Sequence, residues 1–359
     1  MDIIKSIALP IEKKIHKFNN TLYCRERIKH FDEKRNEFIR KNNIPELPAP
    51  IAAQIKNFWG KYVKADIGLN FQRIAALRIP PESLQYIVSE SVLYPILIQK
   101  LNPYHIAKTL ANKGLYNILF ADIKRPNEIV RNVSRNFLDS NNDLLSKDAA
   151  IDRILSLGSP VIFKESIGSF GGRGVKIIKE YDRAIIKQQF DLFKKDFVVQ
   201  ELLTQSQQTA RFNPTSLNTF RVLTLLLNGK FSLLGAWLRC GAKDAQVDNL
   251  TSGGMAACVL PDGRLSYAID FNVPRIDYSP SGLKFEEYRI DYFDRIKQKA
   301  EQLHKRIPLI AMAGWDFALD ENNEPVFIEA NLRRPDTWPW QMTQGPIFGN
   351  RLQEVLDYK

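Results

Sequence analysis

A glycine-rich stretch between two apolar runs is the feature that most constrains the fold of this chain. Residues 163–178 read FKESIGSFGGRGVKII, with four glycines between runs of strand-forming residues. Glycine loses more conformational freedom on folding than any other residue, so this density usually marks close approach of the backbone to a ligand. Backbone N–H groups and the ammonium of Lys164 both suit phosphate. Taken alone, the stretch fits a β-hairpin over a phosphate and a glycine-rich turn without a ligand equally well.

The order of residues excludes the common phosphate-binding loops. A P-loop requires Gly-Lys followed by Ser or Thr and a helix, whereas here Gly174 is followed by Val175, Lys176 and a strand-like run. The dinucleotide fingerprint also requires a helix after the turn. The protein-kinase glycine loop does lie between two strands, but its companion catalytic motifs are absent from the sequence. What remains is a hairpin flap over a triphosphate, with Lys164 entering from the strand before it.

A second hairpin near the C-terminus favours the ligand-binding interpretation. Residues 314–334 read GWDFALDENNEPVFIEANLRR, and a turn centred between Asn322 and Asn323 would place Asp316 opposite Glu329. Alternation along the strand puts Asn331 on the same face as Glu329. Facing carboxylates repel unless a cation lies between them, and hard oxygen ligands suit magnesium held partly by phosphate. The opposite face is predicted to be apolar and buried, which disfavours a surface hairpin with chance acids; it would carry Trp315, Phe317, Leu319, Val326, Ile328 and Ala330.

The rest of the chain predicts an α+β organisation. Residues 1–95 are expected to form a mainly helical region without a catalytic signature. Residues 96–359 are expected to form one domain, with a glycine-flap lobe at about 155–203 and a metal-binding lobe at about 204–345. Strands are grouped into hairpins at Asn-Gly and Asp-Gly turns with helices between them, which favours antiparallel sheets over a doubly wound parallel sheet.

The flap with its preceding lysine, the apolar strand ending in VVQE and the late D…E-x-N hairpin together resemble the ATP-grasp superfamily. More narrowly, NKGLYNILFADIKRP, PTSLNTFRVLTLL and GWDFAL…VFIEAN resemble its sugar-transfer-associated branch, which is found with surface-polysaccharide genes. The similarity spans roughly residues 105–345. It implies an ATP-grasp fold, in which two α+β lobes with antiparallel sheets grip ATP, and it implies ATP and one or two Mg²⁺ ions as cofactors.

The resemblance also implies site residues. The nucleotide would be bound by Lys113, Lys164, Ser169, Gly171, Gly172, Gly174, Gln200, Glu201 and Leu202. Magnesium would be held by Asp316, Glu329 and Asn331. The transferred phosphoryl group would be faced by Arg221, with Asn218 nearby.

One departure from the superfamily pattern concerns a missing cation. Several carboxylate ligases of this superfamily carry an arginine two residues before the metal-binding aspartate, a position that Gly314 occupies here. If the developing charge requires a cation, Arg221 or Arg333 must supply it.

The implied activity is an ATP-dependent carboxylate–amine ligase that works through an acylphosphate. Its substrates would be an acidic sugar, free or linked to a glycan, and an amino acid or amine; Arg239, Lys243, Arg333 and Arg334 could bind the acid. Solvated surface positions are at least as good an interpretation for Arg239 and Lys243. An ATP-grasp kinase acting on a hydroxyl, and a nucleotide-binding protein without turnover, remain the alternatives.

The composition of the chain limits its possible partners and its cellular location. The net charge of +11 is spread thinly, which disfavours nucleic acid as a partner and leaves an anionic ligand or a membrane surface open. The three cysteines, Cys24, Cys240 and Cys258, form no disulfide or zinc pattern. With no signal peptide or apolar span in the sequence, we expect a cytoplasmic protein. The oligomeric state is left open.

Overall fold

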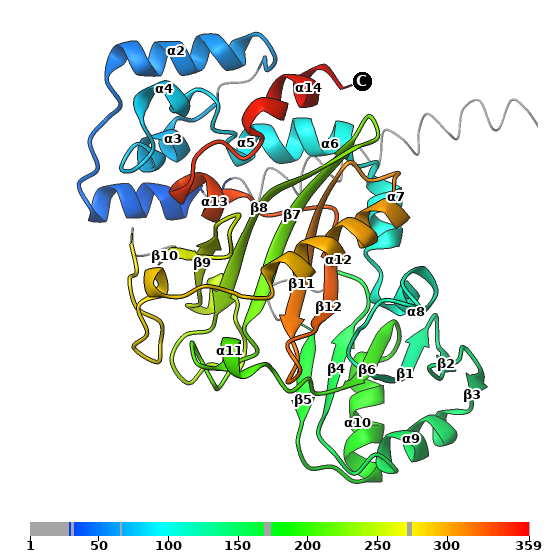
Figure 1. Cartoon of the computed structure of the whole chain (residues 1–359). Coiled ribbons are helices and arrows are strands. Elements are labelled where there is room, and N and C mark those ends of the chain that lie inside the picture. Colours follow the sequence, from blue (N-terminus) through cyan, green and yellow to red (C-terminus); the bar gives the residue numbers. More distant parts are fainter. Residues whose placement is uncertain (1–28, 30–31, 65–66, 169–173, 271–274, 359) are drawn as a thin grey trace, which may run out of the picture. The chain divides into compact units, whose positions relative to one another are not determined.

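The computed structural model divides into two compact units, each of which is described by itself (Figure 1). One unit consists of Met1–Leu101 and Trp340–Lys359, and the other of Asn102–Pro339. Among the residues that the structure describes, no helix is both long and apolar enough to cross a membrane. The described residues are 29, 32–64, 67–168, 174–270 and 275–358.

The first unit is built from short helices, as predicted for the N-terminal region. The side chain of Gln341 ties its C-terminal segment to its N-terminal part, because it accepts from Val88 N at 2.8 Å and donates to Val88 O at 2.9 Å. Its helical segments are residues 32–41, α2 (Ala49–Gly60), α3 (Asn70–Ala75), α4 (Pro81–Leu84), α5 (Glu90–Val92), η1 (Leu93–Leu97), α6 (Ile98–Leu101), η5 (Gly349–Arg351), α14 (Leu352–Asp357) and most of α13 (Trp338–Thr343).

The first sheet of the second unit is antiparallel, with six strands in the order β3-β2-β1-β6-β4-β5. Helices α9 (Lys147–Leu155) and α10 (Arg183–Phe193) bury their apolar stripes with the sheet in one core, where Phe137 and Phe190 stack at 4.9 Å between ring centroids. Ser146 and Asp182 cap these helices. The strands are β1 (Glu128–Val133), β2 (Asn136–Leu138), β3 (Leu144–Leu145), β4 (Val161–Glu165), β5 (Val175–Ile178) and β6 (Phe197–Glu201).

The second sheet is also antiparallel and has six strands in the order β10-β9-β8-β7-β11-β12. Helix α12 (Phe293–Arg306) runs along it (Figure 1) and shares its core with residues of α7 (Tyr104–Leu110) and α8 (Tyr116–Leu119). The strands are β7 (Thr219–Leu227), β8 (Lys230–Cys240), β9 (Met255–Val259), β10 (Leu265–Ile269), β11 (Met312–Leu319) and β12 (Pro325–Asn331). The α+β class with antiparallel sheets is therefore confirmed.

The glycine-rich stretch is framed by the predicted hairpin. Strands β4 and β5 pair antiparallel, with Lys164 opposite Val175, and Glu165 N donates to Gly174 O at 2.8 Å. Gly174 has a φ of 68°, and a Cβ there would lie 2.5 Å from the carboxylate of Glu165. Only glycine fits this position without rearrangement. Three of the predicted flap residues lie outside the described residues: Ser169, Gly171 and Gly172.

The late hairpin places Asp316 opposite Glu329, as predicted, although the turn differs from the expected one. Leu319 pairs with Pro325 and Phe317 with Phe327, so the turn is centred on Asn322 rather than between Asn322 and Asn323. A bulge at Ile328 then adds one residue to β12 and restores the pairing of the two carboxylates.

Because of the bulge, the apolar face of this hairpin differs from the prediction, which was wrong for Val326 and Ile328. Phe327 packs with Phe317 in the core at 6.1 Å between ring centroids. Val326 pairs instead with Ala318, and Ile328 lines a cavity. Because side chains alternate with a period of two, a bulge of one residue moves every residue beyond it to the other face.

Candidate functional site

A cavity of about 500 Å³ lies between the two sheets of the second unit. We call it the large cavity. Its lining comes from β4, β5 and β6 on one side and from β7, β8, β11 and β12 on the other. Its volume is that of a cofactor site. Its charged lining residues are Lys113, Lys164, Lys179, Arg239, Glu201, Asp248, Asp316 and Glu329.

One part of the large cavity is lined by apolar strand residues. Ile162, Val175 and Ile177 line it from β4 and β5, beside Glu201 and Leu202 at the end of β6. Backbone groups at a strand end next to apolar side chains can hold a flat, partly polar ring. The structure thus brings two of the three residues predicted for the adenine hinge to the cavity lining; the third, Gln200, lies within β6 opposite Ile162.

Two lysines line the cavity from different elements. Lys113 begins the short helix η2 (Lys113–Leu115), and its backbone N–H donates to Ser166 O at 3.0 Å next to β4. Lys164 comes from β4 itself. Burial and the nearby charge of Lys113 lower the pKa of Lys164 to about 8, although Glu329 acts in the opposite direction. Two ammonium groups close enough to repel each other form a site that favours an anion.

The carboxylates of the late hairpin are paired with basic side chains. Asp316 is 1% exposed. Its Oδ2 accepts from Arg221 Nη2 at 3.0 Å and from Arg239 Nη2 at 2.9 Å, while Arg221 Nε donates to Oδ1. Glu329 Oε2 lies 3.0 Å from Lys113 Nζ. Burial would raise the pKa of Glu329, but the positive charges of Lys113, Arg221 and Arg239 outweigh it and lower that pKa.

The donor set fits magnesium that arrives with phosphate. Asp316 and Glu329 are direct partners across β11 and β12, and Asn331 Nδ2 lies 3.4 Å from Glu329 Oε1. These three side chains could supply oxygen ligands, which magnesium requires. No group of three or more His, Cys, Asp or Glu that could hold a metal exists in the described part of the chain. Phosphate oxygens and water would therefore have to complete the coordination shell.

Arg221 occupies the space above Gly314. A Cβ on Gly314 would lie 3.3 Å from Arg221 Cδ and 3.4 Å from Asn331 Cβ. The side chain of Arg221 thus crosses from β7 over the glycine to reach Asp316 on β11. An arginine side chain therefore adjoins Gly314, although it belongs to the neighbouring strand.

Two further polar residues at this site are Thr219 and Asp248. Asp248 accepts from the Thr219 hydroxyl, and its Oδ2 lies 3.3 Å from Arg239 Nε. Burial raises the pKa of Asp248, against the lowering effect of Arg239. Arg239 therefore bridges Asp248 and Asp316 inside the cavity and is not a solvated surface residue. The sequence signal for it was the alternation along β8, which puts Arg239 opposite Thr219 on the face of Arg221.

Other predicted residues lie elsewhere. Asn218 is buried, and its Nδ2 donates to Gln205 Oε1 at 3.0 Å, Thr209 O at 2.9 Å and Asn213 O at 2.7 Å, so its amide holds the chain before β7. Lys243 is exposed.

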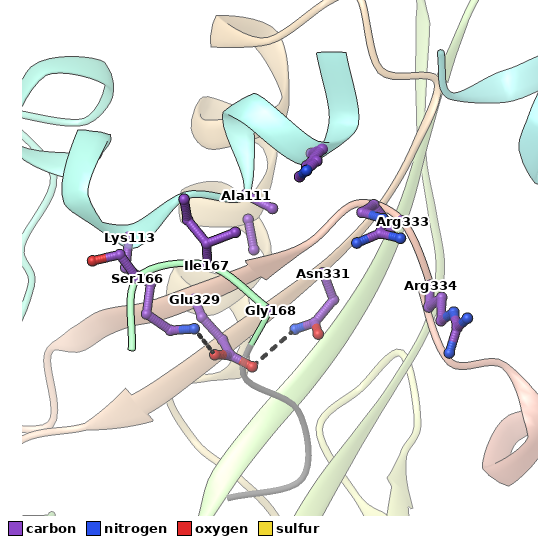
Figure 2. Close-up of a pocket in the computed structure, with 11 residues that line it drawn as sticks. Ala111, Lys113, Ser166, Ile167, Gly168, Glu329, Asn331, Arg333 and Arg334 are labelled. Atoms are coloured by element: carbon purple, nitrogen blue, oxygen red, sulfur yellow. Dashed lines mark hydrogen bonds and ion pairs between the residues drawn. The ribbon is translucent and has the colours of Figure 1, made fainter. Parts of the chain in front are cut away.

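A second, small cavity of about 40 Å³ adjoins Glu329. Figure 2 shows Lys113 and Asn331 reaching Glu329, with Arg333 and Arg334 just beyond β12. Lys113 and Glu329 line both cavities. The small cavity is lined by Lys108, Ala111, Lys113, Ser166, Ile167, Gly168, Glu329, Ala330, Asn331, Arg333 and Arg334.

The comparison with protein families decides the identity of the fold. The model described as sugar-transfer associated ATP-grasp matches residues 95–357. The chain belongs to this family. The predicted ATP-grasp fold is thereby confirmed. No curated protein matches the chain.

Solved structures of similar fold share little sequence with this family member. One is N5-carboxyaminoimidazole synthetase from Staphylococcus aureus complexed with ADP, at 15% identity, 66% of this chain, 50% of that chain and a TM-score of 0.42. Another is biotin carboxylase from Campylobacter jejuni in a β-γ-ATP complex. It is 15% identical over 70% of this chain and 47% of that chain, with a TM-score of 0.44. A third is D-alanyl-alanine synthetase A from Vibrio cholerae, which is 14% identical over 69% of this chain and 60% of that chain, with a TM-score of 0.39. The chain spans about half the length of the first two.

Proposed function

We propose that this ATP-grasp protein is an ATP- and magnesium-dependent carboxylate–amine ligase. The observation that carries the proposal is the pair Asp316 and Glu329, which face each other across β11 and β12 and line a cavity together with Lys113 and Lys164. Carboxylates beside lysines in a cavity between two sheets are the parts that bind a metal–triphosphate complex.

In the proposed reaction, an oxygen of the substrate carboxylate attacks the γ-phosphorus of ATP, the bond to the bridging oxygen breaks, and ADP leaves. The amine nitrogen then attacks the carbonyl carbon of the acylphosphate. Phosphate departs with the electrons of the C–O bond, and the nitrogen loses a proton to solvent.

The residues of this chain would position groups and neutralise charge in that sequence. Lys113 and Lys164 would bind the phosphates as point charges, and the glycine flap would cover them. Arg221, held over Gly314 by its bonds to Asp316, would face the transferred phosphoryl group. Magnesium bound by the carboxylates and by phosphate oxygens would neutralise the charge of the triphosphate.

The family description supports a proposal for the substrates. Its description as sugar-transfer associated supports an acidic sugar of a surface polysaccharide as the acid, joined to an amino acid or amine. Such a substrate would be made on the cytoplasmic side of a membrane. Basic side chains beside the carboxylates, Arg239 and Arg333 among them, support an acidic rather than a neutral substrate.

The test is ATP consumption with magnesium against a panel of uronic acids crossed with amino acids, with ADP and product mass read together. ADP and phosphate that appear only when an acid and an amine are both present, with a product lighter by water than their sum, establish the ligase. A phosphorylated single substrate would identify a kinase instead. If the protein does not bind ATP, as measured by calorimetry, the proposal is wrong.

A further inference from the structure

Asp248 is a buried carboxylate of the large cavity that belongs to neither the proposed nucleotide site nor the proposed metal site. It lies in the loop that follows β8 and is 8% exposed. Hydrogen bonds hold this loop in place. Asn213 Nδ2 donates to Gly241 O at 3.0 Å. Thr215 Oγ1 donates to Ala245 O at 2.9 Å. A charge buried on such a loop loses its hydration, so it needs a fixed partner of opposite charge.

The guanidinium of Arg239 is shared between Asp248 and Asp316. Its Nη2 donates to Asp316 Oδ2 at 2.9 Å, and its Nε lies 3.3 Å from Asp248 Oδ2. The Thr219 hydroxyl accepts from Nε at 3.0 Å and donates to Asp248, so it links the guanidinium to that carboxylate. Nε and Nη2 form the edge of a guanidinium that can bond both oxygens of one carboxylate. Arg239 can therefore leave Asp316 and still be paired with a carboxylate.

Arg221 has no such alternative. Its Nε and Nη2 both donate to Asp316. Among the residues that the structure describes, Asp316 is the one carboxylate with which Arg221 forms an ion pair. If Arg221 left Asp316, a buried guanidinium would lose its compensating charge, which is strongly unfavourable. Of the two arginines that bond Asp316, only Arg239 is free to move away.

The surroundings of Asp316 oppose the binding of a cation. Three guanidinium N–H groups, two from Arg221 and one from Arg239, donate to its two oxygens. A divalent cation at this carboxylate would be repelled by both arginines, and such repulsion is strong in a buried site. Departure of one guanidinium would reduce the repulsion and free a lone pair of Oδ2.

We propose that Asp248 is a positioning residue that binds Arg239 when Asp316 binds magnesium. This inference rests on the proposed function, in which Asp316 is a metal ligand. Without nucleotide, Arg239 bonds Asp316 and compensates its buried charge. When Asp316 becomes a metal ligand, Arg239 turns to Asp248 and to the Thr219 hydroxyl. Asp248 thus favours metal binding at Asp316 without contacting the metal.

The test is the magnesium dependence of nucleotide binding in Asp248→Asn. The affinity for AMP-PNP is measured by calorimetry at a series of free magnesium concentrations, for wild type, Asp248→Asn and the control Asp139→Asn. Asp139 is 5% exposed and pairs with Arg153 at 3.0 Å, but it lines neither cavity. The series is repeated in an Arg239→Met background, with and without Asp248→Asn. Urea denaturation measures the stability of each variant.

We expect Asp248→Asn to need at least tenfold more magnesium for half-maximal binding of AMP-PNP, because Arg239 then has Asp316 as its one charged partner. Asp139→Asn should follow wild type even if its stability falls. In the Arg239→Met background, Asp248→Asn should have no further effect. An unchanged magnesium dependence in Asp248→Asn would overturn the inference. A tenfold effect that persists without Arg239 would also overturn it, because Asp248 would then act on the metal directly.

Two further variants keep the inference testable if Asp248→Asn does not fold. Asp248→Glu retains the charge and should need less than tenfold more magnesium than wild type. Thr219→Val removes the hydroxyl that links Arg239 to Asp248 and should raise the magnesium requirement by a smaller factor than loss of the carboxylate. If Thr219→Val leaves the requirement unchanged, the inference is wrong.

Failure of the proposed ligase would look different. Binding of AMP-PNP requires neither the acid nor the amine, so a ligase assay without product would leave the magnesium series fully interpretable. A wild-type protein that binds no AMP-PNP at any magnesium concentration would refute both proposals.

Discussion

The two cavities that meet at Glu329 balance their charges in different ways. The large one is lined by four basic and four acidic side chains, and three of these acids, Asp248, Asp316 and Glu329, form ion pairs within the protein. The small one is lined by four basic side chains and one acid. A lining that carries charges of both signs suits a ligand that brings both signs, as a triphosphate with magnesium does.

The difference also separates structural from purely ligand-directed charges. The guanidinium of Arg221 is buried and is paired with Asp316, and that of Arg239 is paired with both Asp316 and Asp248. Lys108 is exposed and keeps its hydration in the absence of a ligand. Changes to Asp316 should therefore affect the stability of the fold, whereas changes to Lys108 should not.

The largest expected effect tests that distinction directly. Asp316→Ala would leave the buried guanidinium of Arg221 without its carboxylate and Arg239 with Asp248 alone, which costs about 3–5 kcal/mol of unfolding free energy. Lys108→Gln should stay within about 0.5 kcal/mol of wild type. Urea denaturation of both variants measures the difference. Equal stabilities would contradict the view that Asp316 has a structural role besides the proposed metal binding.

A second expected effect concerns the buried hydrogen bonds on the core side of β11. The Thr224 hydroxyl contacts His304 Nδ1 at 2.7 Å and accepts from Trp315 Nε1 at 2.8 Å, and His304 Nε2 lies 2.8 Å from Ile310 O. Trp315 precedes Asp316 on β11 and points to the opposite face. Burial lowers the pKa of His304 to about 4.

Because the folded pKa is lower than the unfolded value of about 6.5, folding favours the neutral ring. The stabilisation is complete above pH 6.5 and is lost as the pH falls towards 4, by about 3 kcal/mol. Urea denaturation between pH 7 and pH 4 measures it. His304→Gln should flatten this part of the profile, and an unchanged slope in that variant would refute the assignment.

A third expected effect tests whether ATP binds in the large cavity alone. Lys164→Ala removes an ammonium from the large cavity and should weaken ATP binding at least tenfold, as measured by calorimetry. Lys108→Gln should leave the ATP affinity unchanged. If both variants weaken ATP binding alike, the two cavities act as one nucleotide site.

Much of the site framework could be read from local pattern. The period of two along a strand predicted the pairing of Asp316 with Glu329, and the glycines predicted the hairpin of β4 and β5. The bulge at Ile328 was not predictable, because a single inserted residue leaves no mark in composition. The correct pairing of the carboxylates thus came from a turn that was placed half a residue away.

Residues joined only by the tertiary structure were harder to predict. Asp248 lies in a loop without a recognisable motif, and it acquires its place through Arg239 and Thr219 on two strands. Lys108 lines the same cavity as Arg333 only because α7 lies beside the segment that follows β12. Spacing along the sequence does not predict such contacts between distant elements. Strand alternation predicts only which residues share a face of one strand.

The smallest expected effect lies at Gly314, between Arg221 and Asn331. In Gly314→Ala the added methyl would lie 3.3–3.4 Å from Arg221 Cδ, Leu223 Cδ2 and Asn331 Cβ, so these side chains must move by a few tenths of an ångström. Stability should fall by less than about 1 kcal/mol, since the neighbours are side chains that can shift. ATP turnover should fall more than ATP affinity, because Arg221 is the residue displaced. If turnover and affinity fall by the same factor, Arg221 contributes to binding of the nucleotide and not to the transfer step.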